Sequence, residues 1–131
     1  MIAGSEGTGF RVDGEVCGEE TLWRDNYAHS CLAGVVMFPD EKDGTATCTL
    51  VNGFIVYKNW YYGMYLQLPY SLHVTNSMMF ENRVGSNILI YSPDSKKHQY
   101  EDKEVEIRDC VYMGKMPGSN CTDMLDKDTE R

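Results

Sequence analysis

The feature that most constrains the fold is a strict alternation of side chains through residues 59–68, NWYYGMYLQL. In an extended strand, one face would carry Trp60, Tyr62, Met64, Leu66 and Leu68. The other face would carry Asn59, Tyr61, Gly63, Tyr65 and Gln67. A helix fits this segment less well, because it would place tyrosine on both of its faces. The pattern predicts a strand with one dry face and one partly wet face.

Similar strand patterns recur along the chain at 30–38, 45–51, 54–57, 87–91 and 103–112. Turn clusters separate them, and Asn52-Gly53 is typical of a β-hairpin. In 103–112 the alternation changes parity, which a β-bulge near Arg108-Asp109 would explain. No internal repeat is visible. We therefore predict an all-β fold: a single antiparallel β-barrel (lipocalin-like) or sandwich of about seven to eight strands, stapled by disulfides.

The length of 131 residues predicts one β domain over residues 1–131. The glycine-rich residues 1–14 are expected to form a flexible leader, and residues 126–131 a charged tail. The start of the chain has neither the basic nor the apolar region of a signal peptide. No apolar run reaches the length of about 18 residues that a membrane span requires.

Five cysteines are many for a chain of this size, and none shows CxxC spacing. Cys31 and Cys48 flank the turn at 39–44, whereas Cys110 and Cys121 flank the turn at 116–119. These two pairs are the disulfide candidates, with Cys17 either free or displacing one partner. Disulfides form in oxidising compartments, and Asn120 begins an N-x-T glycosylation sequon. Both features predict secretion.

The formal net charge of −8 and the pI of about 4.7 constrain the partners. Such a field repels phosphate backbones, so nucleic acids and anionic membrane surfaces are not expected to bind. It instead favours small cationic ligands or basic proteins. The charge does not distinguish between these two classes, and nothing in the sequence indicates an oligomeric state.

Residues suited to catalysis are sparse. The three histidines are far apart in sequence and lack the spacing of a metal site, so neither a metal nor a cofactor is expected. A dyad of Cys31 with His29 is conceivable, although a cysteine in an apolar strand more often forms a bridge or fills a core. We identify no catalytic residue and predict that the protein is not an enzyme.

The aromatic strand is the best candidate for a binding site. Trp, Tyr and Met on one face of a strand usually fill a core. However, nine tyrosines against four phenylalanines favour a half-polar surface, such as a cavity wall or a protein interface. Both interpretations remain open on the residues alone.

The run ETLWRDNYAHSCLAGVVMFPDEKDGTATCTL resembles secreted tick salivary proteins of the lipocalin-like kind. The resemblance rests on an aromatic lead-in at 22–27, the interval from Cys31 to Cys48, and the following Trp60-Tyr61-Tyr62-Gly63. ILIYSPDS and the later Cys110 resemble the penultimate strand and the cysteine after it. The chain departs from that group in lacking a G-x-W signature and a C-terminal helix with its cysteine.

The resemblance implies a secreted, non-enzymatic protein that intercepts a host defence molecule. In one version, a complement-inhibitor-like protein-binding surface uses Tyr61 and Tyr65 to contact a host protein. In another, a carrier encloses a small amine or lipid mediator, with ligand-binding residues Trp60, Tyr62, Met64 and Leu66. A third possibility is a structural secreted β-domain without a ligand.

Overall fold

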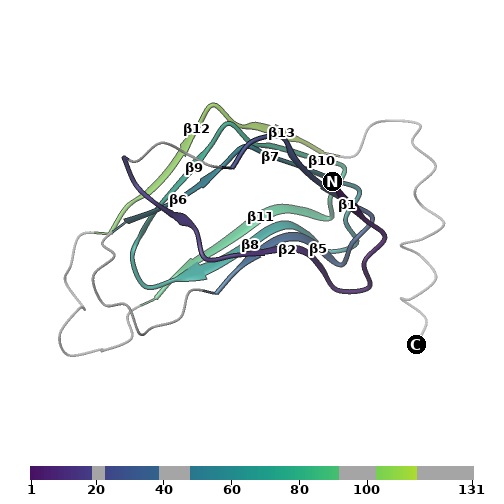
Figure 1. The fold of residues 1–131 in the computed structure, drawn as a ribbon, viewed down its shortest axis with the longest axis horizontal. Coiled ribbons are helices and arrows are strands. Elements are labelled where there is room, and N and C mark those ends of the chain that lie inside the picture. The colour runs from purple at the N-terminus through teal and green to yellow at the C-terminus, as the bar shows by residue number, and fades with distance from the viewer. Residues whose placement is uncertain (19–22, 39–47, 92–102, 115–131) are drawn as a thin grey trace.

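The computed structural model describes residues 1–18, 23–38, 48–91 and 103–114, whose strands form three sheets (Figure 1). The first sheet, sheet A, contains β1 (Ile2–Ala3), β4 (Asn26–His29), β7 (Phe54–Tyr57), β10 (Met78–Phe80) and β13 (Val111–Met113). Sheet B contains β2 (Thr8–Val12), β5 (Ala33–Met37), β8 (Tyr62–Leu68) and β11 (Val84–Ile90). Sheet C contains β3 (Glu15–Val16), β6 (Cys48–Asn52), β9 (Ser71–Thr75) and β12 (Val105–Arg108).

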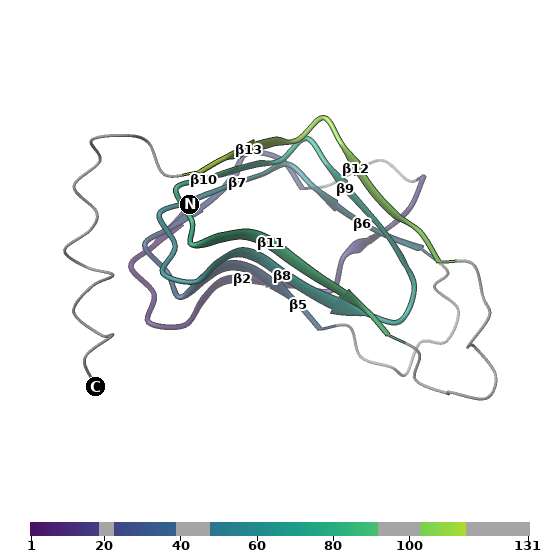
Figure 2. The same cartoon turned by 180° about the vertical axis from the view of Figure 1, so that it is seen from behind.

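The chain visits the three sheets in a fixed order, A to B to C, and then returns to A. Three successive turns, β4–β6, β7–β9 and β10–β12, stack on one another through parallel pairing. Among the strands in the described ranges, β3 alone pairs antiparallel, with β6. The described residues thus form a β-solenoid, in which sheets A and C make one layer and sheet B the other (Figure 2). The expected all-β content is present, but the antiparallel barrel or sandwich is wrong.

The left-handed backbone conformation recurs at the corners of the solenoid. Between sheets A and B, left-handed residues recur at equivalent places in successive turns: Gly4, Ser30, Lys58 and Glu81. Between sheets C and A the corresponding column is Asp25, Gly53, Asn76 and Asp109. Non-glycine residues rarely take this conformation, so its recurrence shows that the corner itself requires it. Asn52-Gly53 is therefore a corner between two sheets and not a hairpin.

The last corner also explains the change of parity in 103–112. Asp109 has a φ of 54°, and it separates β12 in sheet C from β13 in sheet A. The segment is thus two strands of different sheets, and no bulge within one strand is needed. Residues 1–14, expected as a loose leader, contain β1 and β2, which pair with β4 and β5. The tail 126–131 lies outside the described residues.

A column of four glycines, Gly9, Gly34, Gly63 and Gly85, runs across the start of sheet B. A Cβ on Gly34 would lie 2.7 Å from the carbonyl oxygen of Gly63 and 2.9 Å from Nδ2 of Asn59. It would also lie 2.9 Å from Cγ1 of Val56 in sheet A, so the next turn and the facing sheet together leave no room for a side chain. This column is the internal repeat that the sequence conceals, because its members are unevenly spaced along the chain.

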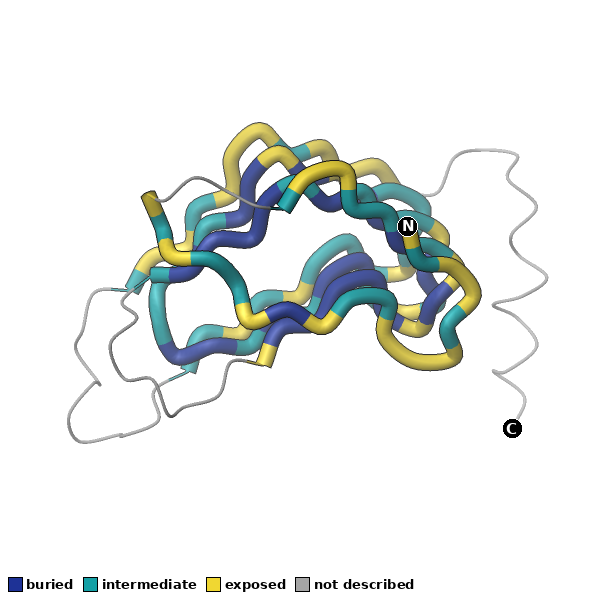
Figure 3. The backbone as a smooth tube through the Cα atoms, viewed as in Figure 1, coloured by how far each residue is buried: buried dark blue, intermediate teal, exposed yellow. Residues whose placement is uncertain are grey.

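The core lies between the two layers, where the dark-blue segments face one another (Figure 3). Its members are equivalent residues of successive turns. In sheet A, each residue of the inward-facing column is at most 1% exposed: Ala28, Val56 and Met79. In sheet B, the same holds for Met37 and Leu66. In β-solenoids each turn buries its apolar side chains against the turns above and below it.

Candidate functional site

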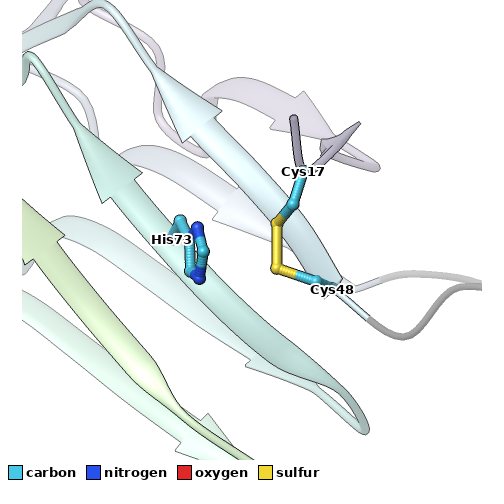
Figure 4. Close-up of side chains that lie close together, drawn as sticks. All are labelled: Cys17, Cys48 and His73. Carbon is cyan, nitrogen blue, oxygen red and sulfur yellow. A yellow bond between two sulfur atoms is a disulfide. The ribbon is translucent and has the colours of Figure 1, made fainter. Parts of the chain in front are cut away.

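The outer face of sheet C brings together two cysteines and a histidine, residue types that bind metals when the cysteines are reduced. Cys17 directly follows β3, and the antiparallel register of β3 with β6 places it opposite Cys48. His73 on β9 pairs with Leu50 of β6 on one side and with Glu106 of β12 on the other. These side chains therefore form a row across all four strands of the sheet, and Figure 4 shows His73 beside the two cysteines.

Cys17 and Cys48 form a disulfide with a Cα–Cα distance of 5.6 Å. The expected pairing of Cys48 with Cys31 is therefore not the one observed. Cys31 is 1% exposed at the corner between sheets A and B, and its thiol donates to the carbonyl oxygen of His29 at 3.2 Å. Cys31 and Cys48 thus lie on different faces of the solenoid. The antiparallel hairpin expected from the sequence would have made them neighbours. Cys110 is also a free thiol.

Cys121 and the sequon residue Asn120 lie outside the described residues. The second expected pair, Cys110 with Cys121, is not supported by the structure, in which Cys110 is a free thiol. Burial raises the pKa of the Cys110 thiol above its ordinary value, an effect that outweighs its hydrogen bond with Ser77. The thiol donates to the carbonyl oxygens of Arg108 and Val74, at 3.3 and 3.5 Å.

His73 contacts two carboxylates through its two ring nitrogens. Nε2 lies 3.3 Å from Oε1 of Glu104, and Nδ1 lies 3.4 Å from Oε2 of Glu106. Glu106 also lies 3.6 Å from the Arg108 guanidinium. Because Glu104 is largely exposed, these pairs contribute little to folding stability. Their importance lies in holding the orientation of the imidazole.

An open groove of about 790 Å³ adjoins His73 at the corner between sheets C and A. Its lining is mostly polar and includes Trp23, Arg24, Asp25, Asn52, His73, Asn76, Arg108 and Asp109. The floor is held by Asn52, whose Oδ1 accepts from Thr75 Oγ1 at 2.9 Å and from Asn76 Nδ2 at 2.8 Å. The groove is thus an open, mostly polar depression whose lining includes both donors and acceptors.

The residues predicted to bind a small ligand are not brought together. Met64 and Leu66 are fully buried in the core. Tyr62 is half-buried on the outer face of sheet B, and Trp60 precedes β8, where its backbone N–H donates to the Cys31 carbonyl at 2.8 Å. None of the four lines the groove beside His73. The predicted dry face is thus correct for Met64 and Leu66, while Tyr62 belongs with Tyr61 and Tyr65.

The outer face of sheet B instead carries a continuous aromatic surface. The Tyr61 and Tyr62 ring centroids are 4.6 Å apart, and those of Tyr62 and Tyr65 are 5.1 Å apart. The Phe38 ring comes next in this row, with its centroid 5.5 Å from that of the Tyr65 ring. The Arg83 guanidinium lies over the Tyr61 ring at 5.0 Å. We call these five residues the aromatic surface; sequence reasoning placed Tyr61 and Tyr65 on a contact surface, assigned Tyr62 to the interior and missed Phe38 and Arg83.

The structure shows why the alternation placed Tyr62 on the wrong face. Gly63 and Met64 are consecutive buried residues, so the alternation shifts by one at the glycine column. Tyr62 and Met64 are two residues apart and would lie on the same face of a regular strand. Because the shift occurs between them, Tyr62 points outward while Met64 is buried. The sequence held no clue to the row of Cys17, Cys48 and His73, because these residues become neighbours only through the stacking of turns.

Comparison with known proteins gives a consistent set of relatives. The chain is similar to a segment of human (Homo sapiens) Fibrocystin-L, with 35% identity over 98% of this chain. Mouse (Mus musculus) Fibrocystin-L is 33% identical over 98% of the chain, and dog (Canis lupus familiaris) Fibrocystin 30% identical over 92%. The chain spans about 3% of the length of these relatives. No family model and no solved structure matches.

These relatives and the solenoid fold overturn the resemblance to tick salivary lipocalins. The complement-inhibitor and lipocalin-carrier interpretations depended on that resemblance and are withdrawn with it. Among the described residues, no helix has the length and apolar character that a membrane crossing needs.

Proposed function

We propose that this chain is a secreted, non-enzymatic binding module that recognises a protein through the aromatic surface on sheet B. The observation that carries the proposal is the unbroken contact of four aromatic rings and one guanidinium on an outer face. Tyr61 is 37% exposed and Phe38 is 41% exposed, so both rings remain available to a partner. Aromatic residues, tyrosine and tryptophan above all, and arginine dominate the energetics of protein interfaces.

The charge around this surface indicates the chemistry of the partner. The four strands of sheet B contain no aspartate or glutamate, although the chain has 20 acidic residues. The only charged residue on these strands is Arg11, and Arg83 lies just before β11. A protein with an apolar patch and a neutral or acidic rim fits this surface. The local composition thus opposes the preference for basic partners that the net charge suggests.

Secretion and the absence of catalysis are parts of the same proposal. The Cys17–Cys48 disulfide supports an oxidising compartment. The conceivable Cys31–His29 dyad has little support, because the thiol contacts the His29 carbonyl and the imidazole stacks on Tyr57 at 4.8 Å. The relatives' names indicate no reaction, and their full length far exceeds that of this chain.

A binding screen tests the proposal. The oxidised protein, tetramerised for avidity, is assayed against purified extracellular domains, and each binder is measured as a monomer. A Tyr61→Ala/Tyr65→Ala variant should bind about tenfold more weakly or worse. The matched control, Met78→Ala/Met113→Ala, removes two exposed side chains of sheet A and should bind normally. Equal weakening by both variants, or no binder among the domains, would contradict the proposal.

A further inference from the structure

We propose that reduction of the Cys17–Cys48 disulfide creates a zinc-binding site on the outer face of sheet C. The two sulfur atoms and the nearest ring nitrogen of His73 all lie within 4.8 Å of one another (Figure 4). Two cysteines and one histidine form a common ligand set for Zn²⁺, and a water molecule can complete the tetrahedron. The proposal is independent of the aromatic surface on sheet B.

The sheet fixes the positions from which the three ligands project. Cys48 and His73 lie on β6 and β9, which pair in parallel, and Cys17 is held opposite Cys48 by the β3–β6 pairing. In a tetrahedral site, Zn–S bonds of about 2.3 Å and Zn–N bonds of about 2.0 Å place the nitrogen roughly 3.5 Å from each sulfur and the two sulfurs roughly 3.8 Å apart. Opening the disulfide lets the two sulfurs separate to that distance by side-chain rotation, without a change in the strands.

The surroundings of His73 provide a second, independent argument. Histidine ligands of metals usually donate their other ring N–H to a carboxylate, which fixes the ring and strengthens the ligand. Here Glu104 lies beside Nε2 and Glu106 beside Nδ1. Whichever nitrogen binds the ion, the other therefore has a carboxylate within about 3.4 Å.

The chemistry balances with a dithiol as the reductant. Dithiothreitol supplies two electrons and two protons, so the disulfide becomes two thiols while the reagent closes into its own cyclic disulfide. Zn²⁺ then replaces the two thiol protons and binds both thiolates together with the neutral imidazole. The disulfide and the zinc complex exclude each other, so the redox state determines which of them sheet C contains.

The test uses Co²⁺ as a coloured substitute for zinc, in a Cys31→Ser/Cys110→Ser/Cys121→Ser background that leaves only Cys17 and Cys48. Protein reduced with dithiothreitol and desalted under argon should bind one equivalent of Co²⁺ with a thiolate-to-cobalt charge-transfer band, and Zn²⁺ should displace it. Oxidised protein should show no such band. Glu104→Gln/Glu106→Gln should weaken binding about 10–100-fold, and His73→Ala should weaken it further.

A second pair of variants removes the need for reduction. Cys17→His cannot form the disulfide but retains three ligands, so it should bind Zn²⁺ without a reductant, whereas Cys17→Ser should bind far more weakly. The proposal is overturned if reduced protein shows no charge-transfer band, if the band is unaffected by His73→Ala, or if Cys17→His and Cys17→Ser bind alike. Loss of the β-sheet circular dichroism on reduction would also overturn it, because the site requires an intact sheet.

Discussion

The side-chain amide of Asn59 donates a hydrogen bond to Oδ1 of Asn82 at 3.0 Å. The two residues occupy the same corner between sheets A and B in successive turns. Asn59 is 3% exposed, and its Oδ1 also accepts from the backbone N–H of Cys31 in the turn before. One asparagine thus joins three turns of the solenoid through its side-chain hydrogen bonds.

Asn59→Ala should therefore lower the free energy of unfolding by about 3 kcal/mol, because it leaves the buried N–H of Cys31 without its acceptor and removes the side-chain bond to Asn82. The exposed Asn87 on β11 is the matched control, and Asn87→Ala should change stability by less than about 0.5 kcal/mol. Chemical denaturation of both variants measures the difference. Equal stability of the two would show that the asparagines do not link the turns.

Gly63→Ala tests the glycine column. Its new methyl group would lie 2.8 Å from Nδ2 of Asn82 and closer still to the carbonyl oxygen of Gly85. Overpacking of this kind should cost about 1–3 kcal/mol, seen as a lower Tm. Gly114 has no atom within 4 Å of such a methyl, so Gly114→Ala should leave the Tm unchanged. A neutral Gly63→Ala would mean that successive turns lie further apart at this column than described.

Leu66 and Tyr65 are neighbours on β8 with opposite roles. Leu66 is fully buried, so Leu66→Ala should destabilise the protein by about 2–5 kcal/mol. Tyr65 points outward and is half-buried, and Tyr65→Ala should cost less than about 1 kcal/mol. Urea unfolding followed by tryptophan fluorescence separates the two outcomes. A larger loss for Tyr65→Ala than for Leu66→Ala would reverse the assignment of the two faces.

The Cys110 thiol should react slowly with iodoacetamide at neutral pH, because burial raises its pKa and so reduces the thiolate fraction. The folded protein holds the proton more tightly than the unfolded chain. This contribution to stability is therefore complete below the unfolded pKa and is lost as the pH rises through the higher folded value. Peptide mapping of the alkylated protein across pH measures the rate at this site. A rate matching that of a free peptide thiol would contradict the direction of the shift.

Several strands were predictable because period-2 alternation is a local property. The expected strand 54–57 coincides with β7, and 59–68 contains all of β8. Alternation does not, however, reveal which strand pairs with which, or in which direction. The signals at Asn52-Gly53 and Arg108-Asp109 indicated bends, but in both places the chain changes sheet instead of reversing.

The candidate metal row could not have been predicted from the same patterns. Cys17, Cys48 and His73 are well separated in sequence, and their distance depends on how β3, β6 and β9 stack. The uneven spacing of Gly9, Gly34, Gly63 and Gly85 concealed the repeat that would have supplied this register. The net charge was similarly uninformative about sheet B, whose strands carry none of the acidic residues.

The most direct test of the solenoid is the disulfide connectivity of the protein, measured by mass spectrometry of a non-reduced digest. Parallel stacking with β3 paired antiparallel to β6 places Cys17 opposite Cys48, so a peptide pair linked through these two residues is predicted. Cys31 should be recovered as a free thiol after denaturation. A Cys31–Cys48 linkage would instead require these segments to be neighbours, as in an antiparallel hairpin, and would contradict the solenoid.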